Sequence, residues 1–114
     1  GESEELFLQT KSFIESVRPA FIHVFPYSRR PGTPAASMPE QVSEEEKKHR
    51  VAILEQLCAQ LHDEFIESNR GISEKVLFES ACKNGMMEGY TGNYVRVERP
   101  YDKALVNTIV DITL

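Results

Sequence analysis

The chain has 114 residues, enough for one domain or two small ones, and its formal net charge is −5. An acidic balance is unusual for a nucleic-acid binder, and two widely separated cysteines do not indicate a disulfide scaffold. No apolar run approaches the roughly 20 residues of a membrane span, and no signal peptide is recognisable, so the sequence predicts a cytoplasmic protein without membrane contact. The acidity lies in residues 43–69, which carry seven acids and three bases, whereas residues 70–114 carry six of each.

The first predicted element is an amphipathic helix over residues 4–17. Ser3 is a suitable N-cap, and two glutamates follow it in the first turn, where the helix dipole favours acids. Apolar side chains recur at helical spacing as far as Val17, and Pro19 prevents the helix from continuing.

A buried strand is predicted over residues 21–25, because this run is apolar and rich in aromatic and β-branched side chains. Pro26 cannot donate a hydrogen bond to a neighbouring strand, so the strand must end there. His23 lies inside the run and is expected to be a hydrogen-bonded core histidine rather than a ligand.

The loop after this strand carries the best candidates for a cofactor- or substrate-proximal site, namely Tyr27, Ser28, Arg30 and Thr33. In parallel α/β folds the catalytic and ligand-binding residues lie at the carboxyl ends of the strands. An arginine can clamp a carboxylate or a phosphate, and the hydroxyls can orient a polar ligand. The alternative is that these side chains only fix the shape of the loop, with Ser28 or Thr33 bonding to nearby backbone.

A long helix is predicted over residues 44–68, opened by a capping box in which Ser43 precedes Glu46 by three residues. Cys58 lies on its apolar stripe, and both Cys58 and Cys82 are expected to be buried free thiols. The basic side chains near the start of the helix are interpreted as a solvated face (Lys47, Lys48, Arg50), and its two histidines as surface or boundary residues (His49, His62). Residues 69–71, Asn-Arg-Gly, end the helix and mark the predicted domain boundary.

From residue 72 the apolar period changes from 3.6 to 2, and short strands alternate with turn signals. This pattern predicts a small antiparallel barrel of the OB type over residues 72–114. The predicted fold class is therefore α+β: helix, strand and long helix in residues 1–69, followed by the barrel.

The barrel segment carries candidate RNA-binding residues. Tyr90 and Tyr94 could stack on bases. Basic side chains could contact phosphates, namely Lys75, Lys83, Arg96, Arg99 and Lys103. We expect Arg96 to be the stronger contact because it shares a strand face with Tyr94, whereas Arg99 lies on the opposite face unless the strand breaks near Pro100. The alternative is that both tyrosines are packing residues.

Two strings resemble a known family. Residues 23–36, His-Val-Phe-Pro-Tyr-Ser-x-Arg-x-Gly-Thr-Pro-Ala-Ala, resemble the late-barrel motif of the radical S-adenosylmethionine methylthiotransferases that modify tRNA. The opening His-Val-Phe-Pro resembles the branch acting on threonylcarbamoyl-adenosine, and the Tyr-Ser-x-Arg-x-Gly-Thr part is shared with the isopentenyl-adenosine branch. Residues 89–97, Gly-Tyr-Thr-x-Asn-Tyr-x-x-Val, resemble the core of the TRAM domain.

The resemblance implies that the chain is the end of a radical S-adenosylmethionine barrel followed by a TRAM domain. The full-length parent would then add a methylthio group at carbon 2 of N6-threonylcarbamoyladenosine, using S-adenosylmethionine and two [4Fe-4S] clusters, with the tRNA anticodon stem-loop as its partner. Tyr27, Ser28, Arg30 and Thr33 would lie near the cofactor and the modified base. Lys47 and Arg50 match a Lys-x-x-Arg pair that in the family precedes the last helix before the TRAM domain, where RNA contact is an option.

The cluster-binding triplet Cys-x-x-x-Cys-x-x-Cys does not occur in this sequence. We therefore expect this chain alone to hold no cluster or other cofactor, to have no metal ligands or catalytic residues, and to be inactive. A barrel that starts in mid-fold leaves unpaired edges, so self-association through residues 21–25 or helix 4–17 is expected. Two alternatives remain open: the isopentenyl-adenosine branch, and a stand-alone RNA-binding or adaptor module without enzymatic activity.

Overall fold

A computed structural model of the chain describes residues 1–81 and 83–114, without the side chains of residues 80, 81 and 83. The predictions for Cys82 and for the side chain of Lys83 therefore lie outside the described residues. The chain divides into two compact units, an N-terminal unit over Gly1–Phe65 and a C-terminal unit over Ile66–Leu114.

The first helix, α1 (Glu4–Val17), begins and ends where the sequence predicts. The Ser3 hydroxyl accepts a hydrogen bond from the Leu6 N–H at 3.2 Å, which satisfies one of the free donors of the first turn. The helix ends at Arg18, which adopts a left-handed conformation (φ 52°) and donates its N–H to the Ile14 carbonyl, just before Pro19.

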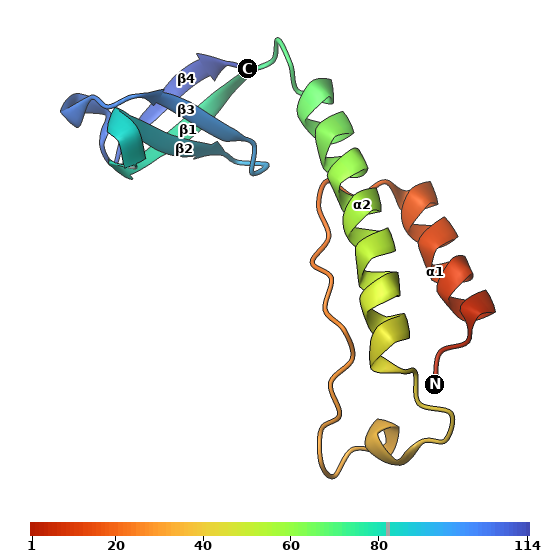
Figure 1. Ribbon diagram of the computed structural model, residues 1–114. Helices are drawn as coiled ribbons and strands as arrows, with labels where there is room; N and C mark the ends of the chain where they lie inside the picture. The colour runs from red at the N-terminus through yellow and green to blue at the C-terminus, as the bar shows by residue number, and fades with distance from the viewer. Residues whose placement is uncertain (82) are drawn as a thin grey trace. The chain divides into compact units, whose positions relative to one another are not determined.

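The second helix, α2 (Glu44–Ser68), runs beside α1 and in the same direction (Figure 1). The Ser43 hydroxyl accepts from the Glu46 N–H at 3.1 Å, so half of the predicted capping box forms. Buried side chains on the stripe include Leu57, Cys58 and Leu61. Although α2 has 25 residues, none of the helices that the structure describes combines the length and hydropathy needed to cross a membrane.

The predicted strand over residues 21–25 is wrong, because this segment forms no ladder with any described residue. It runs along α2 in the opposite direction, on the side away from α1 (Figure 1). The Cys58 thiol takes the place of a neighbouring strand: it accepts from the Ile22 N–H at 3.5 Å and donates to the Ile22 carbonyl at 3.3 Å. Cys58 is a buried free thiol, as predicted.

Exposure alternates along this segment, so only one side of it packs, whereas the continuous apolar run predicts burial on both sides. Ile22 and Val24 are half-buried, whereas Phe21, His23 and Phe25 are exposed. The prediction of a core position for His23 is therefore wrong, since its ring lies edge-on to Phe21 at 4.9 Å on the outer side. Large apolar side chains of α1 are exposed as well, namely Leu6, Leu8, Phe13 and Val17.

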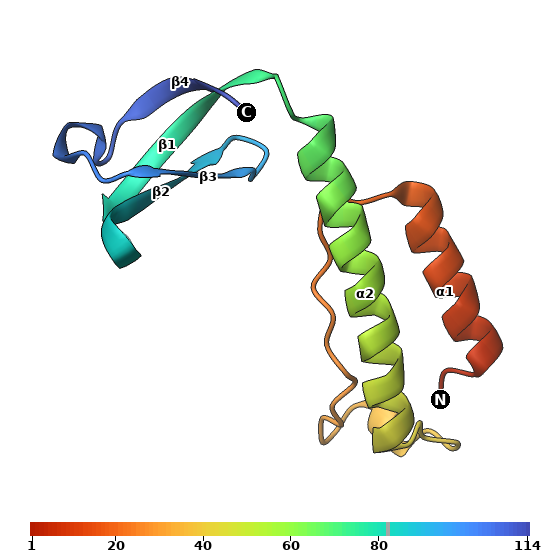
Figure 2. The same cartoon turned by 45° about the horizontal axis from the view of Figure 1, so that its top comes forward.

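The C-terminal unit is a curled, four-stranded antiparallel sheet that forms half of a barrel (Figure 2). Its strands are β1 (Ser73–Ala81), β2 (Met86–Thr91), β3 (Arg96–Pro100) and β4 (Ile109–Thr113), in the spatial order β3-β2-β1-β4. Short helical turns precede β2 and β4, namely η2 (Lys83–Gly85) and η3 (Lys103–Leu105). The period-two pattern thus predicts the class of this unit correctly.

The core of the sheet consists of Val76, Phe78, Met87 and Val97 on its inner face. Gly89 lies opposite Phe78 in the β1–β2 ladder. A Cβ atom on Gly89 would come within 2.6 Å of Val76 Cγ1 and within 2.8 Å of both the Leu77 carbonyl oxygen and Phe78 Cδ1. The glycine therefore permits β1 and β2 to pack with Phe78 fully buried.

We predict that Gly89→Ala destabilises the C-terminal unit by about 1–3 kcal/mol, because the added methyl group meets backbone as well as side chains. Gly92→Ala is the matched control, since a Cβ there would meet nothing within 4 Å. Urea unfolding of the whole chain, followed by tyrosine fluorescence, measures both variants. Equal stability of the two variants would contradict the close approach at Gly89.

Candidate functional site

The loop after residue 25 does not gather its four candidate residues around one point. Tyr27 lines an open hollow of about 310 Å³ in the N-terminal unit, and Ser28, Arg30 and Thr33 are not among its described lining residues. The Thr33 hydroxyl instead donates to the Arg30 carbonyl at 2.8 Å, and the Thr33 N–H donates to the same oxygen at 3.2 Å. Thr33 therefore has the alternative role, in which its side chain bonds to nearby backbone and fixes the shape of the loop.

The hollow beside Tyr27 is lined mainly by apolar side chains, with a basic edge on α2. Its apolar lining includes Phe7, Val24, Met38, Val51 and Leu54. The Lys47 ammonium lies 5.6 Å from the centre of the Tyr27 ring, within the range of a cation–π contact. The arrangement suits an apolar group with a polar or anionic edge.

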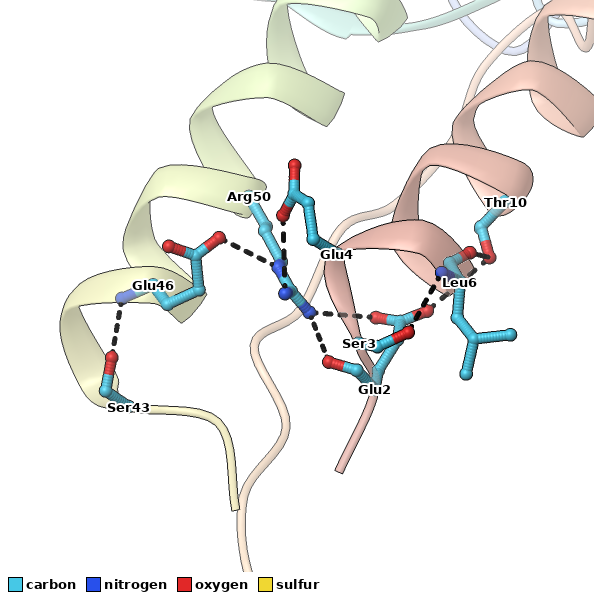
Figure 3. A network of polar contacts seen from close by, with 8 residues as sticks. All are labelled: Glu2, Ser3, Glu4, Leu6, Thr10, Ser43, Glu46 and Arg50. Carbon is cyan, nitrogen blue, oxygen red and sulfur yellow. Dashed lines mark hydrogen bonds and ion pairs between the residues drawn. The ribbon is translucent and has the colours of Figure 1, made fainter. Parts of the chain in front are cut away.

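Arg50 joins the N-terminus of α1 to α2 through several contacts at once (Figure 3). Its Nε donates to the Glu46 carboxylate at 3.0 Å, and its Nη1 donates to the Glu2 carbonyl at 2.9 Å. The Glu4 carboxylate lies 3.5 Å from Nη2, and the Glu2 carboxylate lies 3.6 Å from Nη1. The guanidinium also lies over the Phe7 ring, 5.1 Å from its centre.

The interpretation of Lys47 and Arg50 as a solvated face is wrong, since each side chain is only 11% exposed. The Lys47 ammonium bonds the Glu44 carboxylate at 2.6 Å, and this hydrogen bond is the main reason that the pKa of Glu44 is lowered. The sequence does contain a signal for these contacts, because Glu44–Lys47 and Glu46–Arg50 are spaced three and four residues apart, as helical ion pairs are. Nothing in the sequence shows that Glu2 and Glu4 reach the same arginine.

The remaining candidates on α2 are placed as predicted. His49 is exposed, and His62 is half-buried with its Nδ1 3.0 Å from the Ala20 carbonyl oxygen. Lys48 is exposed, so the prediction of a solvated face is correct for Lys48 although it is wrong for Lys47 and Arg50.

The donor set of this chain does not fit an iron–sulfur cluster. Such clusters are held mainly by cysteine thiolates, and the sequence has two cysteines. The Cys58 sulfur is engaged with the Ile22 backbone. Within residues 1–81 and 83–114, no three His, Cys, Asp or Glu side chains are grouped as ligands of a metal ion would be.

The outer face of the C-terminal sheet brings several RNA candidates together. Tyr90 on β2 lies directly opposite Arg96 on β3 and is half-buried. Arg96 is ion-paired with Glu88 and Glu98 on the same face. The hydrogen bond from Arg96 is the main cause that lowers the pKa of Glu88, and the same bond is the main cause that raises the pKa of Arg96.

Lys75 shares this face and is likewise paired, with its ammonium 3.1 Å from the Asp111 carboxylate. Arg99 is exposed, and the unbroken ladder of β3 against β2 from Arg96 to Pro100 places it on the other face, as predicted. Lys103 is exposed on η3. Two of the predicted phosphate contacts, Lys75 and Arg96, therefore have carboxylate partners within the chain.

Tyr94 does not share a strand face with Arg96, contrary to the prediction, because β3 begins only at Arg96. It lies in the loop between β2 and β3 with a left-handed backbone (φ 66°) and is 80% exposed. A regular strand requires a negative φ, so the alternation that links residues 94 and 96 in a strand does not apply.

No protein-family model matches the chain. Over its whole length the chain is 37% identical to the threonylcarbamoyladenosine tRNA methylthiotransferase MtaB of Bacillus subtilis. It is 39% and 34% identical to the tRNA-2-methylthio-N(6)-dimethylallyladenosine synthases of Mannheimia succiniciproducens and Natranaerobius thermophilus. The chain spans only 24–26% of the length of these curated relatives. The resemblance to tRNA methylthiotransferases that the two motifs indicate is confirmed.

We predict that Arg50→Gln destabilises the N-terminal unit by about 1.5–3 kcal/mol, the range for hydrogen bonds to charged groups. Lys48→Gln, on the exposed side of the same helix, is the matched control and should change stability by less than about 0.5 kcal/mol. Urea unfolding of the whole chain, followed by the helical circular-dichroism signal, compares the two. If both variants unfold at the same urea concentration, Arg50 does not hold the two helices together.

Proposed function

We propose that this chain is the C-terminal part of a tRNA methylthiotransferase, an enzyme that uses S-adenosylmethionine and [4Fe-4S] clusters. The observation that carries the proposal is the similarity over the entire chain to relatives that are named as such enzymes. A methylthio group replaces an unactivated hydrogen, so a radical must first abstract that hydrogen, and a cluster can supply the electron that generates the radical. The cysteine triplet that holds such a cluster does not occur in this sequence, so we expect the chain alone to be inactive.

The proposed substrate is N6-threonylcarbamoyladenosine next to the anticodon, modified at carbon 2. The support is the opening His-Val-Phe-Pro of residues 23–26, together with the similarity to a relative named for threonylcarbamoyladenosine. Relatives named for dimethylallyladenosine are equally similar, which keeps the isopentenyl-adenosine branch as the second candidate.

The C-terminal unit is proposed to be a TRAM-type domain that binds the tRNA anticodon stem-loop in the cytoplasm. The curled sheet has the strand pattern of a small RNA-binding barrel, and Tyr90 lies opposite Arg96 on its outer face. The basic side chains of Arg99 and Lys103 are exposed and are available to contact phosphates. For Arg96 and Lys75, a phosphate would have to replace a carboxylate partner.

The exposed apolar side chains of the N-terminal unit are proposed to cause self-association of the chain. Phe25 is 82% exposed, and Phe13 and Val17 of α1 are also exposed. Water contact with this much apolar surface is unfavourable, so a second copy can cover it.

We predict that sedimentation velocity shows dimers or larger species as concentration rises, and that Phe13→Ser with Phe25→Ser shifts the chain toward monomer. A wild-type chain that stays monomeric at high concentration would contradict the proposal.

The modification itself is testable by nucleoside mass spectrometry. In tRNA from a strain that lacks the gene, we predict loss of the methylthio derivative of threonylcarbamoyladenosine, with the isopentenyl derivative retained. Loss of the isopentenyl derivative instead would assign the other branch. Retention of both derivatives would favour an adaptor without enzymatic activity.

A further inference from the structure

The loop between β2 and β3 has the geometry of a three-residue hairpin loop over residues 92–94. The Thr91 N–H donates to the Val95 carbonyl at 3.0 Å, which closes the hairpin, and the Tyr94 N–H donates to the Thr91 carbonyl at 3.0 Å. Three-residue loops of this kind combine a type I turn with a final residue in the left-handed conformation, which is usually glycine. Here the final residue is Tyr94, with φ 66°.

Packing does not account for a tyrosine at this position. A bulky side chain with positive φ is a backbone outlier, and strain of this kind persists where the surrounding structure enforces it. The Tyr94 side chain is 80% exposed, so the core gains little from it. Gly92, the glycine of the same loop, lies two residues earlier, where the backbone does not adopt a positive φ.

Three polar side chains hold this loop in place. The Thr91 hydroxyl donates to Asn93 Oδ1 at 2.6 Å and accepts from the Val95 N–H at 2.8 Å. The Asn93 amide donates to Asn69 Oδ1 at 3.0 Å. Thr91 and Asn69 are both buried, so these bonds are shielded from water. These bonds hold the backbone of the loop, while the aromatic ring it carries is open to solvent.

We propose that Tyr94 is a preformed stacking platform for one unpaired nucleobase of the bound RNA, and that Thr91, Asn93 and Asn69 are its positioning residues. The assignment rests on the proposed function, which supplies RNA as the partner. Because these bonds already fix the backbone that carries the ring, a stacked base has only the torsions of the tyrosine side chain left to order. Tyrosine suits this role because it offers a large flat surface with only two side-chain torsions.

The charge of the unit favours stacking over phosphate attraction as the source of affinity. Residues 66–114 carry seven acids and six bases, so their net charge gives no general attraction to RNA. Arg96, two residues beyond the platform, is already paired with Glu88 and Glu98. Stacking on Tyr94 needs no charge, so this contact can form without first breaking the ion pairs of Arg96.

The test is titration of a labelled tRNA anticodon stem-loop with the whole chain at low and moderate salt. Tyr94→Asn removes the ring, and asparagine adopts the left-handed conformation readily. We expect this variant to bind about 5- to 150-fold more weakly, the equivalent of about 1–3 kcal/mol per stacked base. Its salt dependence should keep the wild-type slope because no phosphate contact is lost, and its thermal midpoint should equal or exceed that of wild type.

Three matched controls accompany this variant. Tyr94→Phe should bind like wild type, since the stacking face is retained. Tyr101→Asn changes another exposed tyrosine of the same unit and should bind like wild type. A blunt-ended RNA duplex with the same number of base pairs should bind the wild type and Tyr94→Asn equally, because it offers no unpaired base.

The outcomes separate the platform from the proposed function. If the wild-type chain does not bind the stem-loop, RNA binding by this chain is contradicted, and the platform assignment falls with it. If the wild type binds and Tyr94→Asn binds equally well, the platform is overturned while RNA binding stands. Weaker binding with a flatter salt slope would also overturn it, because that result indicates a lost phosphate contact rather than lost stacking.

Discussion

The arrangement of the N-terminal unit depends on the Arg50 guanidinium. Arg50 is fixed on α2, and it reaches the backbone and the carboxylates at the start of α1, which have no sequence proximity to it (Figure 3). A planar guanidinium with five donors can serve several acceptors at once, which a lysine cannot do with the same geometry. Because the side chain is nearly buried, the carboxylates around it compensate a charge that would otherwise be costly to remove from water.

The segment over residues 20–25 shows how the same helix organises the other side of this unit. Cys58 binds both backbone groups of Ile22, and His62 contacts the Ala20 carbonyl, so α2 supplies contacts that a neighbouring strand supplies in a sheet. Side-chain contacts of this kind are few, and the outward-facing aromatic residues remain exposed. An apolar run indicates an extended segment that packs against other groups, and only partner strands can turn it into a ladder.

In the C-terminal unit, the residues of the Gly-Tyr-Thr-x-Asn-Tyr string have separate physical roles. Gly89 allows two strands to approach, and Thr91 with Asn93 fixes the hairpin loop. Tyr90 is half-buried on the outer face, while Tyr94 is held in the solvent with an unfavourable backbone. The two tyrosines look alike in the sequence, and the hairpin places only one of them where its ring has no packing role.

The sequence by itself determined both helices with their N-caps, the β character of residues 72–114 and the family resemblance. These features depend on local spacing and on short motifs, which act within a few residues. Only the tertiary structure decided that Arg50 and Lys47 are nearly buried, that residues 21–25 form no ladder with the described strands, and that Tyr94 leaves the strand. The physical reason is that burial, pairing and a left-handed backbone depend on groups brought together from distant parts of the chain, such as Glu2 with Arg50 and Asn69 with Asn93.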